Sequence, residues 1–279
     1  NPFPTSIHVE IASECNERCV HCYIPHEFKS DLIDDGLFLE ILHQARKMNL
    51  LHITISGGEP MLHPEMITYI VDKIIEKQVY VEQIQVITNG TIASKEAVTA
   101  LNKAYEYITE NCVDWKYPVH IGISTDYHDN QSSIQTVYNF YKQQCKFDVR
   151  FHANDLPDGK HWSFIYAGRA KTTPNIVTRP KLIPHKICTS ADGKVLCMLG
   201  LTLTGNFTLT TQHSFQDTDS PENILCPVDG NLLLAIMQWN YEHPLNCKEA
   251  EYKAWSQHTF DTGKYYGEKA TSHDYDFCK

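Results

Sequence analysis

The chain of 279 residues lacks an excess of positive charge and lacks any long hydrophobic run. Its 24 lysines and arginines against 34 acidic residues give a formal net charge of −10, which provides no general attraction for phosphate backbones or anionic lipid. The longest apolar stretches, such as LLLAIM at 232–237, fall well short of the about 20 residues that a membrane-spanning helix needs. These absences argue against nucleic acid and membranes as partners.

A secretion signal and a dense set of cysteines are also missing. The first residues, NPFPTSIHVE, do not show a charged segment followed by an apolar one. The chain does not begin with methionine, so this absence says little about residues upstream. Ten cysteines are too sparse for a small disulfide-stapled scaffold, and metal ligation or catalysis is the better use of any clustered subset. We therefore expect a cytoplasmic protein.

Strand patterns and amphipathic helix patterns alternate through the first half of the chain. Between the strands, apolar residues recur at three- and four-residue steps, as in Leu37, Phe38 and Ile41. The expected strands are 7–11, 51–56, 84–88, 119–124 and 147–153. This alternation predicts an α/β fold in which a parallel sheet with right-handed crossovers is closed or partly closed like a barrel.

The pattern changes after about residue 160, where prolines interrupt the chain and helical periodicity fades until 232–239. We expect a core domain over 1–175 and a smaller module over 176–279. In parallel α/β sheets, chemistry gathers at the carboxyl ends of the strands. Four unusual segments of this chain follow expected strands, namely ECNERCVHC, SGGEP, TNG and STDYHD.

The segment CNERCVHC places Cys15, Cys19 and Cys22 at a C-x3-C-x2-C spacing. Four thiolates would indicate structural zinc or a closed Fe–S cluster. Three thiolates leave one metal position open, which suits a site where a substrate or cofactor binds the metal. For the cysteines alone, a structural zinc loop is the alternative.

This pattern resembles that of the radical S-adenosylmethionine (SAM) enzymes. In that family the first strand–helix loop carries C-x3-C-x2-C and the second strand ends in GGEP, as do Gly57, Gly58, Glu59 and Pro60 here. The resemblance covers roughly residues 5–170. It implies a partial (β/α)6 TIM-like barrel, a [4Fe–4S] cluster on Cys15, Cys19 and Cys22, and SAM at the open iron. It favours this assignment over structural zinc.

The resemblance also implies the contacts of SAM. Tyr23 fits the aromatic residue that usually follows the third cysteine, Glu59 would offer its carboxylate to the methionyl ammonium group, and the glycines would let backbone approach the ligand. Arg150 would pair with the SAM carboxylate. The other expected contacts are Asn89, Ser124 and Asp126. For Ser124, Asp126 and Arg150 the alternative is an ordinary polar residue or a surface salt bridge.

The segment CTSADGKVLC at 188–197 predicts a hairpin with Asp192-Gly193 at its turn, which places Cys188 opposite Cys197. These two cysteines can share a metal, form a disulfide or remain free thiols.

Together with YAGRA at 166–170, this segment resembles the entry to the SPASM or twitch extension of radical SAM enzymes. The resemblance implies an auxiliary Fe–S cluster on Cys188 and Cys197, with Cys226 and Cys247 as the remaining ligands. The match is imperfect, because the interval after Cys188 is short and no later C-x2-C follows.

The resemblance implies an enzyme that cleaves SAM reductively and uses the 5′-deoxyadenosyl radical to abstract a hydrogen atom from its substrate. The expected substrate is a ribosomally made peptide that is crosslinked, epimerised or oxidised, and the expected electron donor is a flavodoxin or ferredoxin. Cys278 and Asp126 are the candidate catalytic residues. One alternative is a dehydrogenase of a sugar or aminocyclitol alcohol. The other is a non-catalytic protein that binds zinc or an Fe–S cluster.

Overall fold

The structure is a computed structural model that describes most of the first half of the chain and four shorter segments of the second half. The described residues are 6–19, 22, 32–33, 35–48, 52–111, 117–124, 131–152, 196–201, 206–211, 224–227 and 229–242. Within them, no helix combines the length and the hydrophobicity that a membrane crossing requires. The cytoplasmic location stays a prediction.

Strands and helices alternate regularly from residue 6 to residue 152. The elements are β1 (Ser6–Glu10), α1 (Asp35–Met48), β2 (His52–Ser56), a short 3-10 helix η1 (Pro60–Leu62), α2 (Pro64–Glu76), β3 (Gln83–Thr88), α3 (Lys95–Asn111), β4 (Val119–Ser124), α4 (Gln131–Gln144) and β5 (Asp148–His152). Further along are β6 (Leu196–Leu201), β7 (Asn206–Thr211), β8 (Ile224–Pro227) and α5 (Leu232–Glu242). All five expected strands are confirmed, each within one residue at either end.

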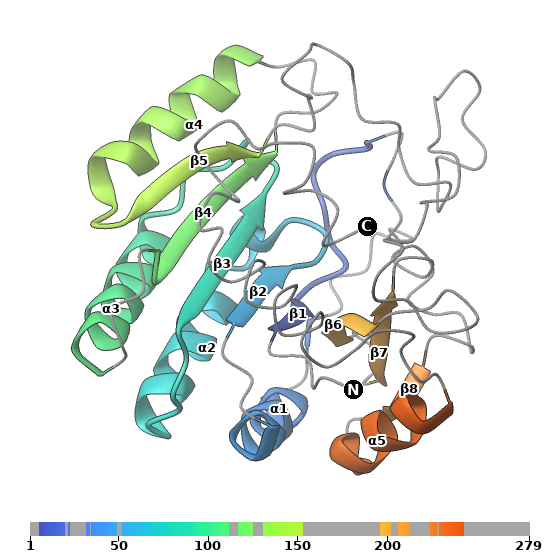
Figure 1. Cartoon of the computed structure of the whole chain (residues 1–279). Coiled ribbons are helices and arrows are strands. Elements are labelled where there is room, and N and C mark those ends of the chain that lie inside the picture. Colours follow the sequence, from blue (N-terminus) through green and yellow to red (C-terminus); the bar gives the residue numbers. More distant parts are fainter. Residues whose placement is uncertain are drawn as a thin grey trace, which may run out of the picture.

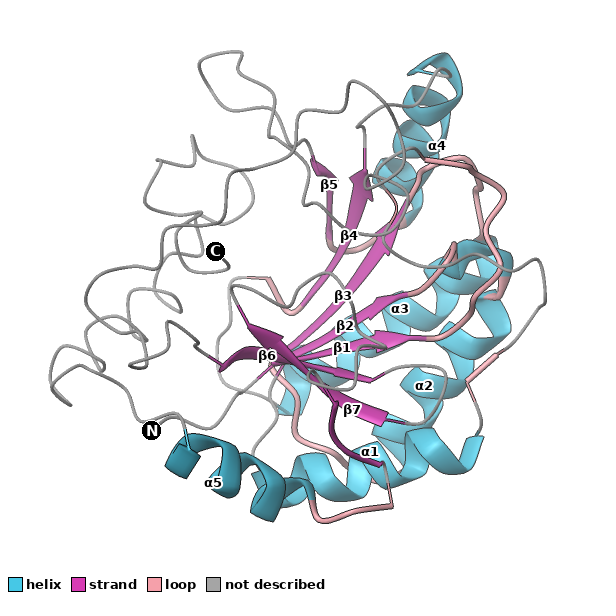
Figure 2. Ribbon diagram, turned by 90° about the vertical axis from the view of Figure 1, so that its right-hand side faces the viewer, coloured by secondary structure: helices cyan, strands magenta, loops and turns pink. Residues whose placement is uncertain are grey.

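The strands form one sheet in the order β5-β4-β3-β2-β1-β6-β7-β8. Strands β1 to β5 and β6 run parallel, whereas β7 and β8 are antiparallel to their neighbours. Figures 1 and 2 show α1 to α4 along one face of this curved sheet. The α/β fold class is therefore confirmed, and the barrel is partial, because the described strands leave β5 and β8 as edges. The sixth parallel strand lies beside β1.

The expected domain boundary at 175/176 lies outside the described residues and stays a prediction. Strands β6, β7 and β8 fall in the expected second module, yet they extend the same sheet as the core strands.

The two faces of the sheet differ in chemistry. One register row runs Val9, Ile55, Val86, Ile121 and Val149 across β1 to β5, and each of these side chains is at most 1% exposed. These residues share the apolar core with the helices. Because side chains alternate along a strand, the row one residue earlier lies on the opposite face. That row contains His8, Thr54, Gln85, His120 and Asp148, so the face away from the helices is polar.

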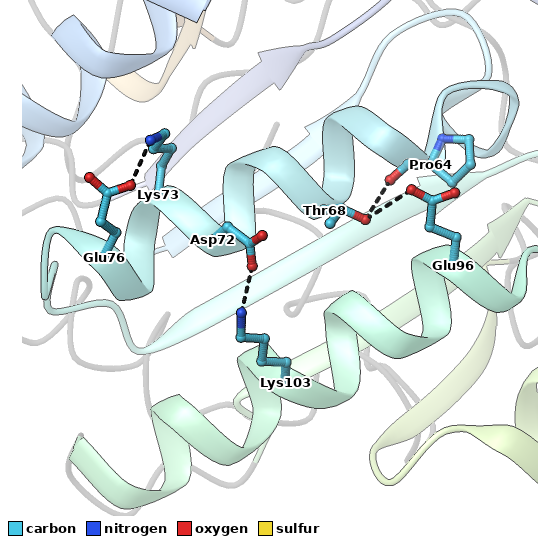
Figure 3. Close-up of polar contacts among 7 residues, drawn as sticks. All are labelled: Pro64, Thr68, Asp72, Lys73, Glu76, Glu96 and Lys103. Carbon is cyan, nitrogen blue, oxygen red and sulfur yellow. Dashed lines mark hydrogen bonds and ion pairs between the residues drawn. The ribbon is translucent and has the colours of Figure 1, made fainter.

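Helices α2 and α3 pack side by side on the helical face. Pro64 begins α2, where its missing N–H costs no hydrogen bond, and Ser94 caps α3 by accepting a hydrogen bond from the backbone N–H of Ala97 at 3.1 Å. On the surface between the helices, Lys103 forms an ion pair with the carboxylate of Asp72 at 2.7 Å. Figure 3 draws this contact. Exposed pairs of this kind contribute little, so the buried apolar faces hold the helices together.

Candidate functional site

Three loops meet at the carboxyl ends of β1, β2 and β3. The cysteine loop follows β1, the GGEP loop follows β2, and the loop with Thr88, Asn89 and Gly90 follows β3. Backbone hydrogen bonds join the first two loops, because the N–H of Gly58 donates to Ala12 O at 2.7 Å and that of Glu59 donates to Glu14 O at 2.8 Å. The structure thus brings together the two motifs that the sequence singles out.

The two glycines of GGEP make this close packing possible. Gly57 has a φ of +136°, a conformation that residues with a side chain rarely adopt. A Cβ atom on Gly58 would lie 2.0 Å from the carbonyl oxygen of Glu14, which is backbone and cannot rotate away. The close approach seen here is therefore between two loops of the chain itself. The approach of this backbone to a ligand stays a prediction.

Glu59 links the GGEP loop to the loop after β3. Its side chain is fully buried. Oε1 accepts hydrogen bonds from the backbone N–H of Met61 at 2.9 Å and the hydroxyl of Thr88 at 2.6 Å, and Oε2 accepts one from the backbone N–H of Asn89 at 2.7 Å. Three of the roughly four acceptor positions of a carboxylate are thus filled by the chain itself.

The burial of Glu59 also affects its ionisation. Removal from water raises the pKa of Glu59 to about 7, although its three hydrogen bonds act in the opposite direction. Part of the population is therefore ionised near neutrality. Whether the carboxylate also meets an ammonium group stays a prediction.

Cys15, Cys19 and Cys22 are all half-buried on the loop after β1. Burial raises the pKa of the Cys15 thiol, and the charges of Glu59 and Cys22 raise it further, while the backbone N–H of Glu17 and the amide of Asn89 lower it. Among the described residues, no three Cys, His, Asp or Glu side chains are grouped so that they can hold a metal ion. In the described residues, the loop therefore carries three thiols that are not gathered around one point.

The donor set fits an Fe–S cluster. Such clusters are held by thiolates, and N–H groups that face the sulfurs adjust their potential. Cys15 has two such donors, the backbone N–H of Glu17 at 3.4 Å and Nδ2 of Asn89 at 3.9 Å. Which cysteines ligate a metal stays a prediction.

Comparison with known proteins supports the sequence-based assignment. The family model described as "Radical SAM superfamily" matches residues 9–114. This segment is a radical SAM superfamily domain. It contains the three cysteines, the GGEP loop and the loop after β3, and a [4Fe–4S] cluster and SAM are the cofactors that this superfamily uses.

Two curated relatives match part of the chain, one named as a peptide cyclase and the other as a bacteriocin biosynthesis protein. The PqqA peptide cyclase of Methylorubrum extorquens (strain PA1) is 30% identical over 178 residues, which are 63% of this chain and 42% of the relative. The antilisterial bacteriocin subtilosin biosynthesis protein AlbA of Bacillus subtilis (strain 168) is 28% identical over 156 residues, which are 52% of this chain and 30% of the relative. The chain thus spans less than half the length of these relatives.

A solved structure supports the fold. The structure of native anSMEcpe with bound AdoMet and Cp18Cys peptide matches with a TM-score of 0.54 at 15% identity. The match covers 85% of this chain and 81% of the other. At this identity the likeness concerns the fold alone.

Arg150 lies away from the three-loop junction, whereas Ser124 lies beside the loop after β3, because it directly follows Ile123, the β4 residue that pairs with Thr88. Ser124 is half-buried at the carboxyl end of β4. Arg150 lies further back on β5, opposite Gly122 of β4, and its guanidinium pairs with Asp148 and stacks 4.1 Å from the ring centre of Tyr117. These partners lie toward the amino ends of the strands. The pairing of Arg150 with a SAM carboxylate stays a prediction.

Asp148 responds to these cationic neighbours. Burial by itself would raise the pKa of Asp148, but hydrogen bonds and charge from Arg150 and Lys142 outweigh burial and lower the pKa. The group around Arg150 is therefore a local ion-pair cluster in which Arg150 and Lys142 share the carboxylate of Asp148.

Several expected site residues lie outside the part of the chain that the structure describes. These are Tyr23, Asp126, Cys188, Cys247 and Cys278. Cys197 is part of β6, but the described residues do not include its side chain.

Cys226 is described and half-buried on β8. Burial, together with the charge of Asp229, raises the pKa of its thiol to about 11. The register puts Cys226 opposite Phe207, and Phe207 opposite Leu201, so Cys226 is not the cross-strand neighbour of Cys197. An auxiliary cluster, and with it a SPASM or twitch extension, stays a prediction.

Asn16, Thr91 and Tyr141 are site residues that the sequence does not reveal. Asn16 and Thr91 bridge the cysteine loop and the loop after β3, and the Asn16 amide donates to the Thr91 hydroxyl at 2.7 Å. Tyr141 of α4 accepts from the backbone N–H of Ser94 at 3.2 Å and donates to Ile92 O at 2.8 Å. In the sequence, Asn16 and Thr91 lie within or next to the motifs, which is their only signal, and Tyr141 has no such signal.

Proposed function

We propose that the chain is a radical SAM enzyme that modifies a peptide. The observation that carries the proposal is the direct packing of the GGEP loop on the cysteine loop at one end of the sheet. The radical SAM superfamily match to residues 9–114 supports the same chemistry. The names of the PqqA peptide cyclase and the subtilosin biosynthesis protein support a peptide as the substrate.

Cys15, Cys19 and Cys22 would hold the [4Fe–4S] cluster. Bound there, the cluster and SAM would supply the electron and the radical that remove a hydrogen atom from the substrate. The segment 57–60 would lie against SAM from the adjacent loop. Glu59 would keep this loop in place, because it fastens the segment to Thr88 and Asn89.

Apart from Arg150, which lies further back on β5, the remaining SAM contacts in this proposal come from residues near or just after the carboxyl ends of the strands. Ser124 ends β4 on the same rim as the three loops. The other proposed contacts are Tyr23, Asn89, Asp126 and Arg150. Each SAM cleavage consumes one electron, and a flavodoxin or ferredoxin would deliver it.

Anaerobic reconstitution with iron and sulfide tests the enzymatic part. After reconstitution, the protein should contain about four irons per [4Fe–4S] site. When dithionite and SAM are added, it should release 5′-deoxyadenosine. The Cys19→Ala variant should lose both properties. Cys145→Ala is the matched control, because this half-buried thiol at the end of α4 lies outside the three loops and burial raises its pKa to about 12. If the protein holds an intact cluster but releases no 5′-deoxyadenosine, the proposal of an enzyme is wrong, and the protein is a non-catalytic Fe–S protein.

The substrate class needs a separate experiment. Short open reading frames beside the gene supply candidate peptides, which are incubated with reconstituted enzyme and SAM and analysed by mass spectrometry. Crosslinking or oxidation should remove two hydrogen atoms from the peptide, and epimerisation in deuterated water should add one deuterium. If active enzyme leaves the encoded peptides unchanged but oxidises a sugar or aminocyclitol alcohol, the peptide assignment is wrong.

A further inference from the structure

The orientation of the Asn89 amide is fixed by its neighbour Thr91. Oδ1 of Asn89 accepts hydrogen bonds from the backbone N–H of Thr91 at 3.0 Å and from its hydroxyl at 2.6 Å. A backbone N–H can only donate, so the oxygen of the amide must face Thr91. The amide nitrogen therefore points the other way, toward the cysteine loop. Rotating the amide by half a turn would set two N–H donors against each other.

The amide nitrogen of Asn89 has two acceptors on the cysteine loop. Nδ2 lies 2.9 Å from Oδ1 of Asn16 and 3.9 Å from Sγ of Cys15. The Asn16 amide in turn donates to the Thr91 hydroxyl at 2.7 Å, which closes a ring of three side chains. Each member of this ring both donates and accepts. The ring therefore holds an N–H group against the first cysteine in one orientation only.

Asn89 is also fastened from the other side. Its backbone N–H donates to the buried carboxylate of Glu59 at 2.7 Å. The residue thus contacts all three loops of the site: its own, the GGEP loop through Glu59, and the cysteine loop through Asn16 and Cys15. A residue held at so many points keeps its donor in position without help from a ligand.

An N–H group directed at a ligating sulfur withdraws negative charge from it. The reduced cluster carries one more negative charge than the oxidised one, so such a donor favours the reduced form and raises the reduction potential. We propose that Asn89 is a positioning residue that holds the Cys15 thiolate and raises the reduction potential of the cluster bound there. This inference rests on the proposed function. In the step concerned, dithionite gives one electron to the oxidised cluster, and no bond is formed or broken.

The Asn89→Asp variant tests the inference with almost no change in shape. It replaces the donor with a charged oxygen, and the midpoint potential is followed by electron paramagnetic resonance during a dithionite titration. At a fixed solution potential, the ratio of reduced to oxidised cluster should fall by roughly fivefold or more, the factor that one hydrogen bond of ordinary net strength is worth. Asn89→Ala removes the donor without adding charge and should shift the potential the same way by less.

Asn102→Ala is the matched control. The Asn102 side chain also joins two segments, donating to Gln144 O at 3.1 Å and accepting from the backbone N–H of Lys146 at 2.8 Å, but it lies on α3 away from the cysteine loop. This variant should keep the wild-type potential. If Asn89 were merely structural, its variants and Asn102→Ala would lose thermal stability without any shift in potential.

The outcomes separate this inference from the function on which it rests. Wild-type potentials in both Asn89 variants, at full iron content, would overturn the inference and leave the enzyme standing. If Asn89→Asp fails to bind iron, Asn89→Ala decides by the same criterion. If the wild-type protein binds no cluster, or cleaves no SAM with its cluster intact, the proposed function fails whatever the Asn89 variants show.

Discussion

Glu59 and Arg150 are two charged side chains that the family resemblance assigns to the methionine part of SAM, yet the fold surrounds them differently. Glu59 is fully buried and accepts hydrogen bonds from η1 and from the loop after β3. Arg150 has its ion-pair partner, Asp148, on its own strand, and Tyr117 just before the adjacent strand. One residue connects separate loops, and the other belongs to a local cluster.

This difference shows that a charged residue on a strand or in the loop after it can have one of two roles. A buried carboxylate satisfied by backbone donors fixes where loops lie relative to one another, and it does so before any ligand arrives. A local ion pair stabilises its own strand and leaves distant loops unaffected. Substitutions around Glu59 should therefore disturb cofactor assembly, whereas substitutions around Arg150 should disturb mainly stability.

Gly58→Ala should have the largest effect. Its new Cβ atom would lie 2.0 Å from Glu14 O and 2.7 Å from Ser13 O, so the GGEP loop must separate from the cysteine loop. We expect a loss of about 3 kcal/mol in the free energy of unfolding, at the upper end for overpacking, and a clear fall in iron content after reconstitution. Denaturant titration and iron analysis measure these two quantities.

Gly36→Ala controls for the chemical change itself. Gly36 is exposed in the first turn of α1, where alanine favours the helix by up to about 1 kcal/mol. Iron content should stay at the wild-type level in this control. Normal iron content in Gly58→Ala would show that the two loops do not need their present packing.

The ionisation of Glu59 should appear in the pH dependence of stability. Its pKa is about 7 in the folded protein and 4.5 ordinarily, so between these values the folded state binds more protons than the unfolded state. The contribution of Glu59 is therefore full below pH 4.5 and is lost as pH rises through 7, with a slope of at most about 1.4 kcal/mol per pH unit. Denaturant titrations of wild type and Glu59→Gln across this range measure the difference.

The Glu59→Gln variant cannot titrate at this position, so its difference from wild type isolates the carboxyl group. The new side chain also places an amide N–H where Oε2 of Glu59 accepts from Asn89, which lowers stability at every pH. A constant difference between the two proteins from pH 4.5 to 7 would contradict the raised pKa.

Arg150→Ala should have the smallest effect on the site. Loss of the Asp148 ion pair and of the stacking on Tyr117 should cost about 1–2 kcal/mol of unfolding free energy. Iron content should not change, since the three loops lie elsewhere, and the pKa of Asp148 should rise because Arg150 no longer lowers it. A fall in iron content as large as that of Gly58→Ala would show that the surroundings of Arg150 matter to the site as much as those of Glu59.

Most of the fold follows from local patterns in the sequence. Val9, Ile55, Val86 and Ile121 lie in short alternating or apolar segments, which suffice to locate each strand and its buried face. The position of β6 beside β1 does not follow, because alternation marks a strand without naming its neighbour.

For the site, sequence motifs locate the loops but not the contacts between them. The cysteine spacing and GGEP identify two of the three loops at the junction. The link from Glu59 to Thr88, and the ring of Asn16, Asn89 and Thr91, depend on how separate loops pack in space. The direction of the Arg150 side chain likewise depends on Asp148 and Tyr117, which no motif marks.

The place of β1 in the sheet has a consequence for biosynthesis. The strand that leads into the cysteine loop pairs with β2 on one side, but on the other side Ile7 pairs with Leu199, far along the chain. Contacts between residues so distant in sequence form late and slowly, and a nascent chain cannot form this one until β6 has left the ribosome. Strand β1, which leads into the cysteine loop, is therefore paired along only one edge until late in synthesis, and the loop takes its final setting only when β6 closes the other edge.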